Sequence, residues 1–386
     1  MFSGKLHELH RLNLYRQIRD RSSAQGPKIL LEGRELINFS SNDYLGLAAH
    51  PEVVRAACDV AERFGLGGGA SRLLSGGSSL HLMLEGKIAA FKDTEAALIF
   101  NSGYAANTGT IPAIADEGDV IFSDELNHAS IVDGCRLSRA RTIVYRHGDI
   151  DHLSCLIKNE KGRRKVVVTD TVFSMDGDIA PLTELYNLCL AFDSKSGNQH
   201  STLLYIDDAH GTGVLGNGRG ALAHFNIPPE PWIIQMGTLS KALGSFGAFA
   251  AGNRTVIEWL TNTARSFIFS TAIPACAVAA AMKAIELVEF IPELIRQLLK
   301  NCDQTVNMLR SKGYDAGESG TPIIPLKVNS VEEALQLSRS LHEKGIYAPA
   351  IRPPTVKTPR VRITVTAAHS EGDIQALADA LGQMRK

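Results

Sequence analysis

The stretch Leu203-Leu-Tyr-Ile-Asp-Asp-Ala-His210 is an apolar run that ends in two carboxylates and a histidine. A second apolar run, Trp232–Met236, leads into Gly237-Thr-Leu-Ser-Lys241, where small residues surround a lysine. Parallel strands present their carboxyl ends at one edge of a sheet, and ligands bind outside that edge. The two stretches therefore predict a parallel sheet with Asp207 and Lys241 at the ends of its strands.

Short apolar runs of the same kind recur along the middle of the chain, separated by stretches with helical spacing. Most are β-branched or aliphatic and are bounded by Gly, Asp or Ser, which is typical of strands buried in an α/β sheet. The seven runs are Ala97–Phe100, Val120–Ser123, Ile143–Tyr145, Val166–Thr169, Leu203–Asp207, Trp232–Met236 and Ala248–Ala251. The helical patterns between them are Ser79–Phe91, Tyr104–Ala115 and Pro181–Phe192. This alternation predicts a mostly parallel seven-stranded sheet covered by helices.

The two ends of the chain differ from this middle part. Residues 1–44 predict an amphipathic helix, Leu6–Arg21, and a hairpin, Lys28–Phe39. Residues 45–282 contain the strand–helix alternation and form the large α/β domain, and residues 283–386 have the composition of a small α+β domain. The elements expected near and within this last part are the helices Ala275–Leu299, Gln304–Ser311, Glu332–Lys344 and Gly372–Met384 and the strands Ile323–Val328 and Arg362–Thr366.

Composition and charge restrict the classes of function. The chain has 386 residues, 44% of them hydrophobic, with 40 basic and 41 acidic residues. A net charge of −1 provides no basic field for nucleic acid or for an anionic membrane. No stretch is long and apolar enough to span a bilayer, and the first residues lack the apolar segment of a signal peptide. The six cysteines are scattered without metal-ligand spacing, so we expect reduced thiols in a cytoplasmic protein.

Lys241 has the most informative surroundings of any lysine in the chain. A lysine and a carboxylate at two strand ends can form an ordinary salt bridge, and each residue taken singly favours that interpretation. The small residues on both sides of Lys241 favour a second one, in which its amine reacts. A lysine made nucleophilic by its surroundings forms Schiff bases with carbonyl compounds.

The segment Asn101-Ser-Gly-Tyr-Ala-Ala-Asn107 is a strand end that opens directly into a helix. The free N–H groups at a helix N-terminus bind anions, and Gly103 allows a close approach to the backbone. A phosphate could bind there, beside Tyr104. An ordinary strand-to-helix turn would have the same sequence, so the segment alone does not decide between them.

Taken together, these features resemble the α-oxoamine synthases, a family of fold-type I pyridoxal-phosphate (PLP) enzymes. The resemblance extends over nearly the whole chain. Its motifs are Asn38-Phe-Ser-Ser-Asn-Asp-Tyr-Leu-Gly-Leu47, Thr171-Val-Phe-Ser-Met-Asp-Gly-Asp178, Asp207-Asp-Ala-His-Gly-Thr-Gly213, Thr238-Leu-Ser-Lys241 and Ile351-Arg-Pro-Pro-Thr-Val356. It implies a PLP-binding large domain, a smaller C-terminal domain and a short N-terminal segment.

The resemblance also implies roles for the residues around the cofactor ring. Lys241 would hold PLP as an imine and later move protons at the α-carbon of the substrate. Asp207 would pair with the pyridinium nitrogen and keep it protonated. His128 would stack on the face of the ring opposite the lysine. His210 and Ser174 would bind the phenolic oxygen of the cofactor or groups around it.

The phosphate site follows from the same resemblance. Gly103, Tyr104 and Thr238 would bind the phosphate, Thr238 through its hydroxyl. In the family the active site lies at a dimer interface, and Ser270 and Thr271 match the segment through which the partner subunit reaches the phosphate. The resemblance therefore implies a homodimer with shared active sites.

Substrate residues are implied by the match in the same way. Arg352 and Arg362 match arginines near the carboxylate of the amino acid, and we favour Arg362 as its direct, bidentate partner. Asn42 and Arg16 match positions near the substrate entrance. The loop Gly65-Leu-Gly-Gly-Gly-Ala-Ser-Arg72 is interpreted as close backbone packing near the acyl channel.

Within the family, the chain is most similar to the member that condenses L-alanine with a pimeloyl thioester of coenzyme A or acyl carrier protein, on the path to biotin. Three alternatives stay open. One is a related synthase that uses glycine or serine. Another is a cofactor-less subunit that only scaffolds a partner. The third, a nicotinamide dehydrogenase, is disfavoured because no convincing strand precedes the glycine-rich loop and no ribose-binding acid follows it.

Overall fold

A computed structural model of the chain describes residues 2–193, 202–317 and 320–384. The chain forms two compact units. The first contains Met1–Ala49, Ser174–Asp178 and Arg296–Lys386, and the second contains His50–Phe173 and Ile179–Ile295. The predicted division into residues 1–44, 45–282 and 283–386 stays a prediction. The two ends of the chain, which we expected to be separate segments, lie in the same unit.

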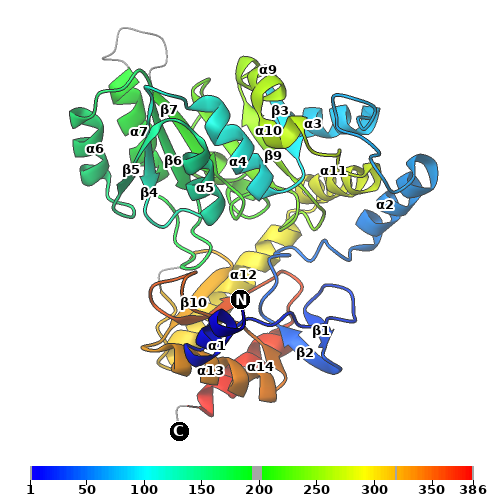
Figure 1. The fold of residues 1–386 in the computed structure, drawn as a ribbon. Helices are drawn as coiled ribbons and strands as arrows, with labels where there is room; N and C mark the ends of the chain where they lie inside the picture. The colour runs from blue at the N-terminus through cyan, green and yellow to red at the C-terminus, as the bar shows by residue number, and fades with distance from the viewer. Residues whose placement is uncertain (1, 194–201, 318–319, 385–386) are drawn as a thin grey trace. The chain divides into compact units, whose positions relative to one another are not determined.

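The second unit is built on a seven-stranded sheet with the order β3-β9-β8-β7-β6-β4-β5 (Figure 1). Its strands are β3 (Ala96–Phe100), β4 (Val120–Asp124), β5 (Arg141–Tyr145), β6 (Lys165–Asp170), β7 (Thr202–Asp207), β8 (Ile233–Thr238) and β9 (Ala248–Gly252). All adjacent pairs are parallel except those of β9, which runs antiparallel to both β3 and β8. The mostly parallel, seven-stranded sheet predicted from the apolar runs is confirmed.

Helices cover the two faces of this sheet, and its central strands are buried and mostly apolar, whereas the edge strand β5 is largely exposed. Val166, Val167 and Val168 of β6, for example, have no exposed surface although their side chains alternate between the faces. The helices are α2 (Pro51–Phe64), α3 (Ser79–Phe91), α4 (Gly103–Ile114), α5 (Ala129–Leu137), α6 (Ile150–Asn159), α7 (Leu182–Asp193), α8 (Ala221–His224), α9 (Arg254–Thr263), α10 (Arg265–Ile268) and α11 (Ala275–Phe290). A 3-10 turn, η1, spans Gly216–Gly218.

The first unit contains two three-stranded sheets, ordered β1-β2-β11 and β10-β13-β12. Their strands are β1 (Lys28–Leu31), β2 (Arg34–Asn38), β10 (Ile323–Lys327), β11 (Ile346–Tyr347), β12 (Ala350–Ile351) and β13 (Arg360–Thr364). The helices are α1 (Ser3–Arg11), α12 (Glu293–Ser311, which begins at the end of the second unit), α13 (Val331–Glu343) and α14 (Glu371–Gly382). The expected hairpin is confirmed: β1 and β2 are antiparallel, and both turn residues, Glu32 and Gly33, have positive φ.

Three of the predicted helices had the wrong extent. The N-terminal helix ends at Arg11 instead of Arg21, because Asn13 takes a φ of 56°, which a right-handed helix cannot contain. The expected single helix over Ala275–Leu299 is divided into α11 and α12, and the separately expected helix Gln304–Ser311 is the last part of α12. The break contains Pro292, which lacks the N–H group that an uninterrupted helix requires.

Residue His369 of the first unit is a buried, neutral histidine. Its ring stacks on Phe39 with ring centroids 4.3 Å apart. Its Nδ1 accepts a hydrogen bond from the Thr366 N–H at 3.0 Å, and its Nε2 lies 3.2 Å from the carbonyl oxygen of Asn38. Burial lowers the pKa of His369 to about 4.

We expect His369 to make the protein less stable as the pH falls from about 6.5 to about 4. In this window the unfolded chain, with an ordinary histidine pKa, binds a proton that the folded chain does not. The difference corresponds to about 3 kcal/mol of unfolding free energy. Denaturant titrations at several pH values would measure the slope for the native chain and for His369→Gln.

The comparison with His369→Gln is needed because another group titrates in the opposite sense. Burial raises the pKa of Asp43 to about 6, so its folded-state protonation makes the protein less stable as pH rises through that value. Asp43 makes the same contribution to the pH dependence of stability in the native chain and in His369→Gln. A His369→Gln variant with the same pH slope as the native chain would contradict the assignment.

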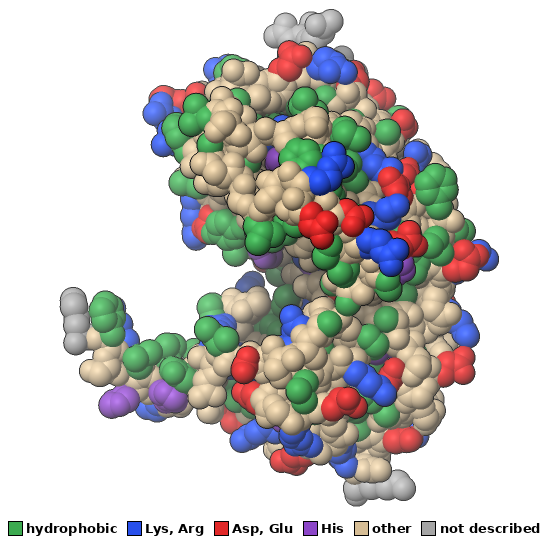
Figure 2. Space-filling view, turned by 90° about the vertical axis from the view of Figure 1, so that its right-hand side faces the viewer, with side chains coloured by type: hydrophobic (Ala, Val, Ile, Leu, Met, Phe, Trp, Pro, Cys, Tyr) green, Lys and Arg blue, Asp and Glu red, His purple; other side chains and the backbone are tan. Residues whose placement is uncertain are grey.

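Within the described residues, no helix combines the length and the apolar character needed to cross a membrane. On the face drawn in Figure 2, acidic and basic side chains are interspersed. This distribution agrees with the net charge of −1 and provides no patch of one sign.

Candidate active site

The carboxyl ends of β6, β7 and β8 carry the polar groups that the sequence places at strand ends. Asp207 is the last residue of β7 and is 4% exposed. Its Oδ2 accepts a hydrogen bond from Asn107 Nδ2 at 2.7 Å, and its Oδ1 accepts one from the Ala209 N–H at 3.0 Å. Burial raises the pKa of Asp207, and the positive charge of Lys241 opposes that shift.

Lys241 follows β8 and is held beside a histidine. Its Nζ lies 2.8 Å from Nε2 of His210, which follows β7 and is buried. Asp207 lies beside Met236 in the parallel register of β7 and β8, and the positive charge of Lys241 acts on this carboxylate by lowering its pKa. The structure therefore brings Asp207, His210 and Lys241 together at one edge of the sheet, where the parallel topology predicts a ligand.

His128 comes from the loop between β4 and α5, where it is the N-terminal cap of the helix. Its backbone N–H donates to Asp170 Oδ2 at 2.7 Å, and Asp170 lies beside Asp207 in the register of β6 and β7. The Nδ1 of His128 accepts from the Ser130 N–H at 3.2 Å. Burial lowers the pKa of His128, so the imidazole is predominantly neutral at pH 7.

The expected phosphate residues lie at two strand ends. Ser102 caps α4 by accepting from the Ala105 N–H, so the helix begins with the N–H groups of Gly103 and Tyr104, which have no intrahelical acceptor. The phenol of Tyr104 is half-exposed and donates a hydrogen bond to Asp133. The backbone N–H of Tyr104 is therefore the group available to a phosphate. The hydroxyl of Thr238, at the end of β8, lies 3.0 Å from the carbonyl oxygen of Gly247.

Ser270 and Thr271 lie in a segment that packs on the glycine-rich loop of the same chain. Thr271 forms a β-bridge with Ser71. A Cβ atom on Gly68 would lie only 2.6 Å from the carbonyl oxygen of Ala272. The backbones at these two positions therefore approach more closely than a residue other than glycine at position 68 would allow. Close backbone packing of this loop is thus confirmed, while its place near an acyl channel stays a prediction.

In the first unit, Arg362 and Asn42 form one cluster with Ser174. Arg362 is 5% exposed, and its Nε donates to the carbonyl oxygen of Ser174 at 2.7 Å. Both terminal nitrogens of the guanidinium lie 3.1 Å from Asn42 Oδ1. Asn42 and Arg16 are both expected near the substrate entrance, and the amide oxygen of Asn42 contacts Arg362.

Arg16 and Arg352 form a second cluster of the first unit. The Nη2 of Arg352 donates to the carbonyl oxygen of Tyr15 at 2.6 Å, while its buried Nε has no hydrogen-bond partner among the described residues. Nη2 of Arg16 lies 3.4 Å from the Thr355 hydroxyl. Burial and the nearby charge of Arg16 both lower the pKa of Arg352. Two neighbouring guanidinium groups with a buried, unused N–H suit an anionic ligand.

Sequence reasoning missed the residues that support these side chains. Asn107, Ser130, Asp170 and Tyr205 surround Asp207 and His128. They are polar residues within otherwise apolar helices and strands, and that signal could have identified them. A buried polar group needs a partner, so a polar residue in a buried run indicates a specific contact.

A buried ion pair supports the turn that carries His210. Lys92 Nζ lies 2.8 Å from Asp208 Oδ2, and neither side chain has exposed surface. Lys92 also donates to the carbonyl oxygen of Arg219 at 2.6 Å. Asp208 accepts from the Thr171 hydroxyl at 2.7 Å and from the Ala221 N–H at 3.2 Å. The pair is therefore fully hydrogen-bonded inside the second unit.

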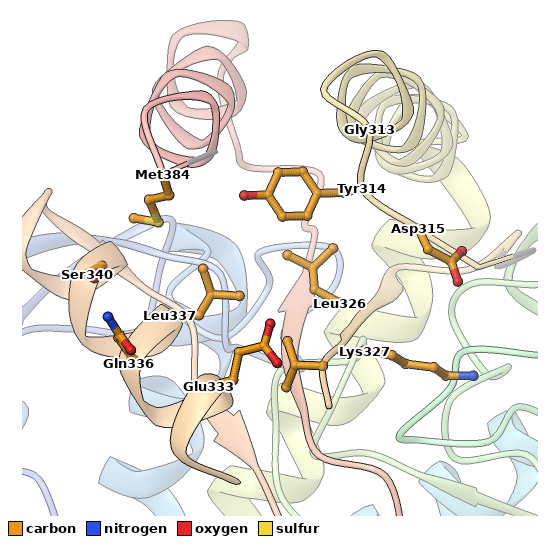
Figure 3. A pocket seen from close by; sticks show the side chains of 11 residues that line it. Gly313, Tyr314, Asp315, Leu326, Lys327, Glu333, Gln336, Leu337, Ser340 and Met384 are labelled. Carbon is orange, nitrogen blue, oxygen red and sulfur yellow. The ribbon is translucent and has the colours of Figure 1, made fainter. Parts of the chain in front are cut away.

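A cavity of about 550 Å³ lies in the first unit, between α12, α13, α14 and β10 (Figure 3). It is lined by Gly313, Tyr314, Asp315, Leu326, Lys327, Val328, Glu333, Gln336, Leu337, Ser340 and Met384. None of the predicted site residues is among them. The cavity is therefore separate from the residues assigned to cofactor and substrates.

The side chains at the sheet edge fit the chemistry of PLP. An amine that can form an imine, Lys241, lies near an acceptor-only carboxylate, Asp207, which suits a protonated ring nitrogen. The buried amide contact to Asp207 favours the ionised carboxylate. The α4 N-terminus supplies N–H groups for a phosphate.

Comparisons with known proteins agree with this fit. Residues 34–381 match the family model of aminotransferase class I and II. The chain is 48% identical to an 8-amino-7-oxononanoate synthase of Geobacter sulfurreducens, covering 100% of this chain and 97% of the relative. It is 46% identical to an enzyme of the same name from Thermoanaerobacter pseudethanolicus, covering 99% and 96%.

A solved structure of serine palmitoyltransferase from S. paucimobilis, with a bound PLP–myriocin aldimine, matches with a TM-score of 0.91 and 27% identity, over 99% of this chain and 96% of that one. Sequence and structure comparisons thus give the same fold-type I architecture. The chain therefore belongs to the aminotransferase class I and II family and, within it, to the 8-amino-7-oxononanoate synthases, and its cofactor is pyridoxal phosphate.

Proposed function

We propose that this chain condenses L-alanine with a pimeloyl thioester to give 8-amino-7-oxononanoate, carbon dioxide and a free thiol, in biotin biosynthesis. The observation that carries the proposal is the placement of Lys241 Nζ beside His210, together with Asp207, at one sheet edge. The family supports an amino acid and an acyl thioester as the two classes of substrate.

Bound PLP supplies an electron sink that stabilises negative charge at the α-carbon of an amino acid. Lys241 is proposed to hold the cofactor covalently through Nζ and to remove and return the proton of that carbon. Asp207 keeps a proton on the ring nitrogen, because an ionised carboxylate is the strongest acceptor available to it. His210 holds Lys241 Nζ in position at 2.8 Å.

The remaining residues bind and orient the cofactor. His128 is proposed to lie flat against the ring, and its neutral state avoids a second positive charge beside a protonated ring. Gly103 and Tyr104 offer backbone N–H groups, and Thr238 a hydroxyl, for the phosphate. Ser174 is proposed to act at the phenolic oxygen. Ser270 and Thr271 are proposed to reach the phosphate of a partner subunit.

The overall reaction balances. The carbon–hydrogen bond at the α-carbon of alanine breaks and a carbon–carbon bond to the thioester carbonyl forms, while the carbon–sulfur bond breaks and the released proton balances the thiol. The carboxylate of alanine leaves as carbon dioxide, and a proton takes its place on the α-carbon. A pimeloyl thioester of coenzyme A and one of acyl carrier protein both satisfy this balance.

Two cationic clusters support the choice of substrates. Arg362 is the proposed partner of the carboxylate of alanine, which would take the place of Asn42 Oδ1 at the two terminal guanidinium nitrogens. Arg16 and Arg352 suit the second carboxylate, at the far end of the pimeloyl chain, because the buried Nε of Arg352 is unused within the described residues. The reaction has only these two carboxylates to bind.

Exposed apolar side chains support a homodimer. Leu66, Leu74 and Phe269 are 73%, 79% and 71% exposed, and they come from the glycine-rich loop, its continuation and the segment before Ser270. The loop and this segment are neighbours, because Ser71 pairs with Thr271, and apolar side chains gathered in one place on a surface mark a protein interface.

The free cysteines support a cytoplasmic location, where thiols stay reduced.

The experiment that tests this function compares amino acids. We expect the purified chain to absorb visible light through its bound cofactor, and the absorbance to change on adding alanine. One methyl group in an apolar pocket discriminates by roughly 10- to 200-fold, so kcat/KM for alanine should exceed that for glycine by about this factor. Steady-state kinetics with pimeloyl-CoA and pimeloyl-carrier protein would measure it.

The likeness to serine palmitoyltransferase makes serine the second candidate amino acid. Serine is therefore included in the same assays, with palmitoyl-CoA as its acyl donor. A higher kcat/KM for serine or glycine than for alanine would replace the proposed substrate. A colourless protein that PLP does not turn yellow would refute a PLP-dependent function altogether.

A further inference from the structure

Asn107 occupies the centre of a buried hydrogen-bond network in the second unit. It lies in α4, packed against α5 and the sheet, and has no exposed surface. Its Nδ2 lies 2.7 Å from Asp207 Oδ2 and 2.8 Å from Ser130 Oγ. Its Oδ1 lies 2.6 Å from the hydroxyl of Tyr205. One amide thus contacts three polar side chains that are far apart in the sequence.

The donors and acceptors fix the orientation of this amide. An ionised Asp207 can only accept, so the NH₂ group of Asn107 must face it, and the amide oxygen must face Tyr205. Burial and the charge of Asp207 raise the pKa of Tyr205 well above its ordinary value, so its hydroxyl keeps the proton that it donates. Without that donor, the amide oxygen of Asn107 would be buried without its hydrogen bond from Tyr205, and the amide would be held from its NH₂ side alone.

The second N–H of the same amide leads to His128. Ser130 Oγ accepts from Asn107 Nδ2, so its own proton is free to point to His128 Nδ1, 2.7 Å away. The Ser130 N–H also donates to this nitrogen. His128 Nδ1 is therefore an acceptor, and the neutral ring carries its proton on Nε2.

We propose that Asn107, oriented by the Tyr205 hydroxyl, is a positioning residue that holds the Asp207 carboxylate and, through Ser130, the His128 ring in one fixed arrangement. The inference deepens the proposed function and rests on it, since it assigns Asp207 and His128 to the cofactor ring. It adds two residues that do not themselves touch the cofactor.

A purely structural role for the same residues would have a different signature. Asn107 would then only join α4 to the sheet, and removing one hydroxyl would lower stability without changing the cofactor. A positioning role instead alters the ring nitrogen and the stacked imidazole while the chain stays folded. The absorbance spectrum and the affinity for PLP separate these two cases.

The test uses Tyr205→Phe, which removes only the hydroxyl, in the PLP-loaded enzyme. We expect the cofactor spectrum to change, PLP to bind about 5- to 10-fold more weakly, and kcat to fall by a similar factor, as for the loss of one hydrogen bond. KM for alanine should stay the same. Asn107→Leu removes the contact to the charged carboxylate itself, so its loss of PLP affinity should be about 10- to 100-fold.

The matched control is Tyr145→Phe. Tyr145 is also fully buried, at the end of β5 in the same sheet, and lies outside the Asn107 network. We expect it to leave the spectrum, PLP affinity and kcat unchanged. Circular dichroism and thermal unfolding would check that each variant is folded.

A folded Tyr205→Phe enzyme with native spectrum, PLP affinity and kcat would overturn the inference. So would equal effects of Tyr205→Phe and Tyr145→Phe. The proposed function fails differently, because the native chain itself would then lack PLP absorbance or alanine turnover. If Asn107→Leu does not fold, Tyr205→Phe alone decides.

Discussion

Lys241→Ala is expected to abolish turnover and the visible absorbance of the lysine-bound cofactor. The substitution removes both the covalent attachment of PLP and the group that moves the α-proton. A positioned acid–base group alone contributes roughly 10²- to 10⁴-fold, so the loss of kcat should be on the order of 10⁴-fold or more. Absorbance spectra with added PLP and a thiol-release assay would measure the two effects.

Lys165→Ala is a suitable control for this prediction. Lys165 is a half-buried lysine at the start of β6 in the same unit, and its Nζ donates to the carbonyl oxygen of Ile157 at 2.7 Å. Its loss should leave the cofactor spectrum intact. A Lys241→Ala enzyme that retains native activity would refute the assignment of this lysine.

Lys92→Met is expected to lower the free energy of unfolding by about 3–5 kcal/mol, the usual effect of removing one partner of a buried ion pair. The variant would leave the Asp208 carboxylate buried without its cation. The carboxylate is closely enclosed, since a Cβ atom on Gly220 would lie only 1.9 Å from Asp208 Oδ2. Urea unfolding of the native chain and the variant would measure the difference.

Two further variants show whether charge is the cause. In Lys92→Met/Asp208→Asn no charge is left buried, so the double variant should be more stable than Lys92→Met alone. Lys87 lies in α3, the helix whose C-cap is Lys92, but its ion pairs with Glu286 and Glu289 are partly exposed. Lys87→Met should therefore cost less than about 1 kcal/mol. Equal losses from Lys87→Met and Lys92→Met would contradict the importance of burial.

The sheet could be predicted from the sequence because parallel strands must be apolar on both faces. All seven apolar runs became strands, since each is too short for a helix. Helix ends were harder to predict. The early end of α1 depends on the backbone of Asn13, and the break after α11 on Pro292, both inside favourable helical patterns.

The site was predictable only in part. The positions of Asp207, His210 and Lys241 at or just after predicted strand ends indicated that they lie together, because the carboxyl ends of parallel strands meet at one edge of a sheet. The supporting contacts join positions far apart in the sequence: Asn107 to Asp207, and Lys92 to Asp208. A single sequence carries no information on such pairings, and only the folded chain reveals them.

The pairing of β2 with β11 has a consequence for synthesis on the ribosome. Ile37 lies beside Ile346 in a parallel register, so the sheet that begins near the N-terminus is completed only by a strand near the C-terminus. Residues 50–295, by contrast, can emerge and begin to fold while the rest is still being translated. A stalled or truncated nascent chain would therefore expose the apolar side of β1 and β2, where Ile29, Leu31 and Leu36 pack together, to chaperones and proteases.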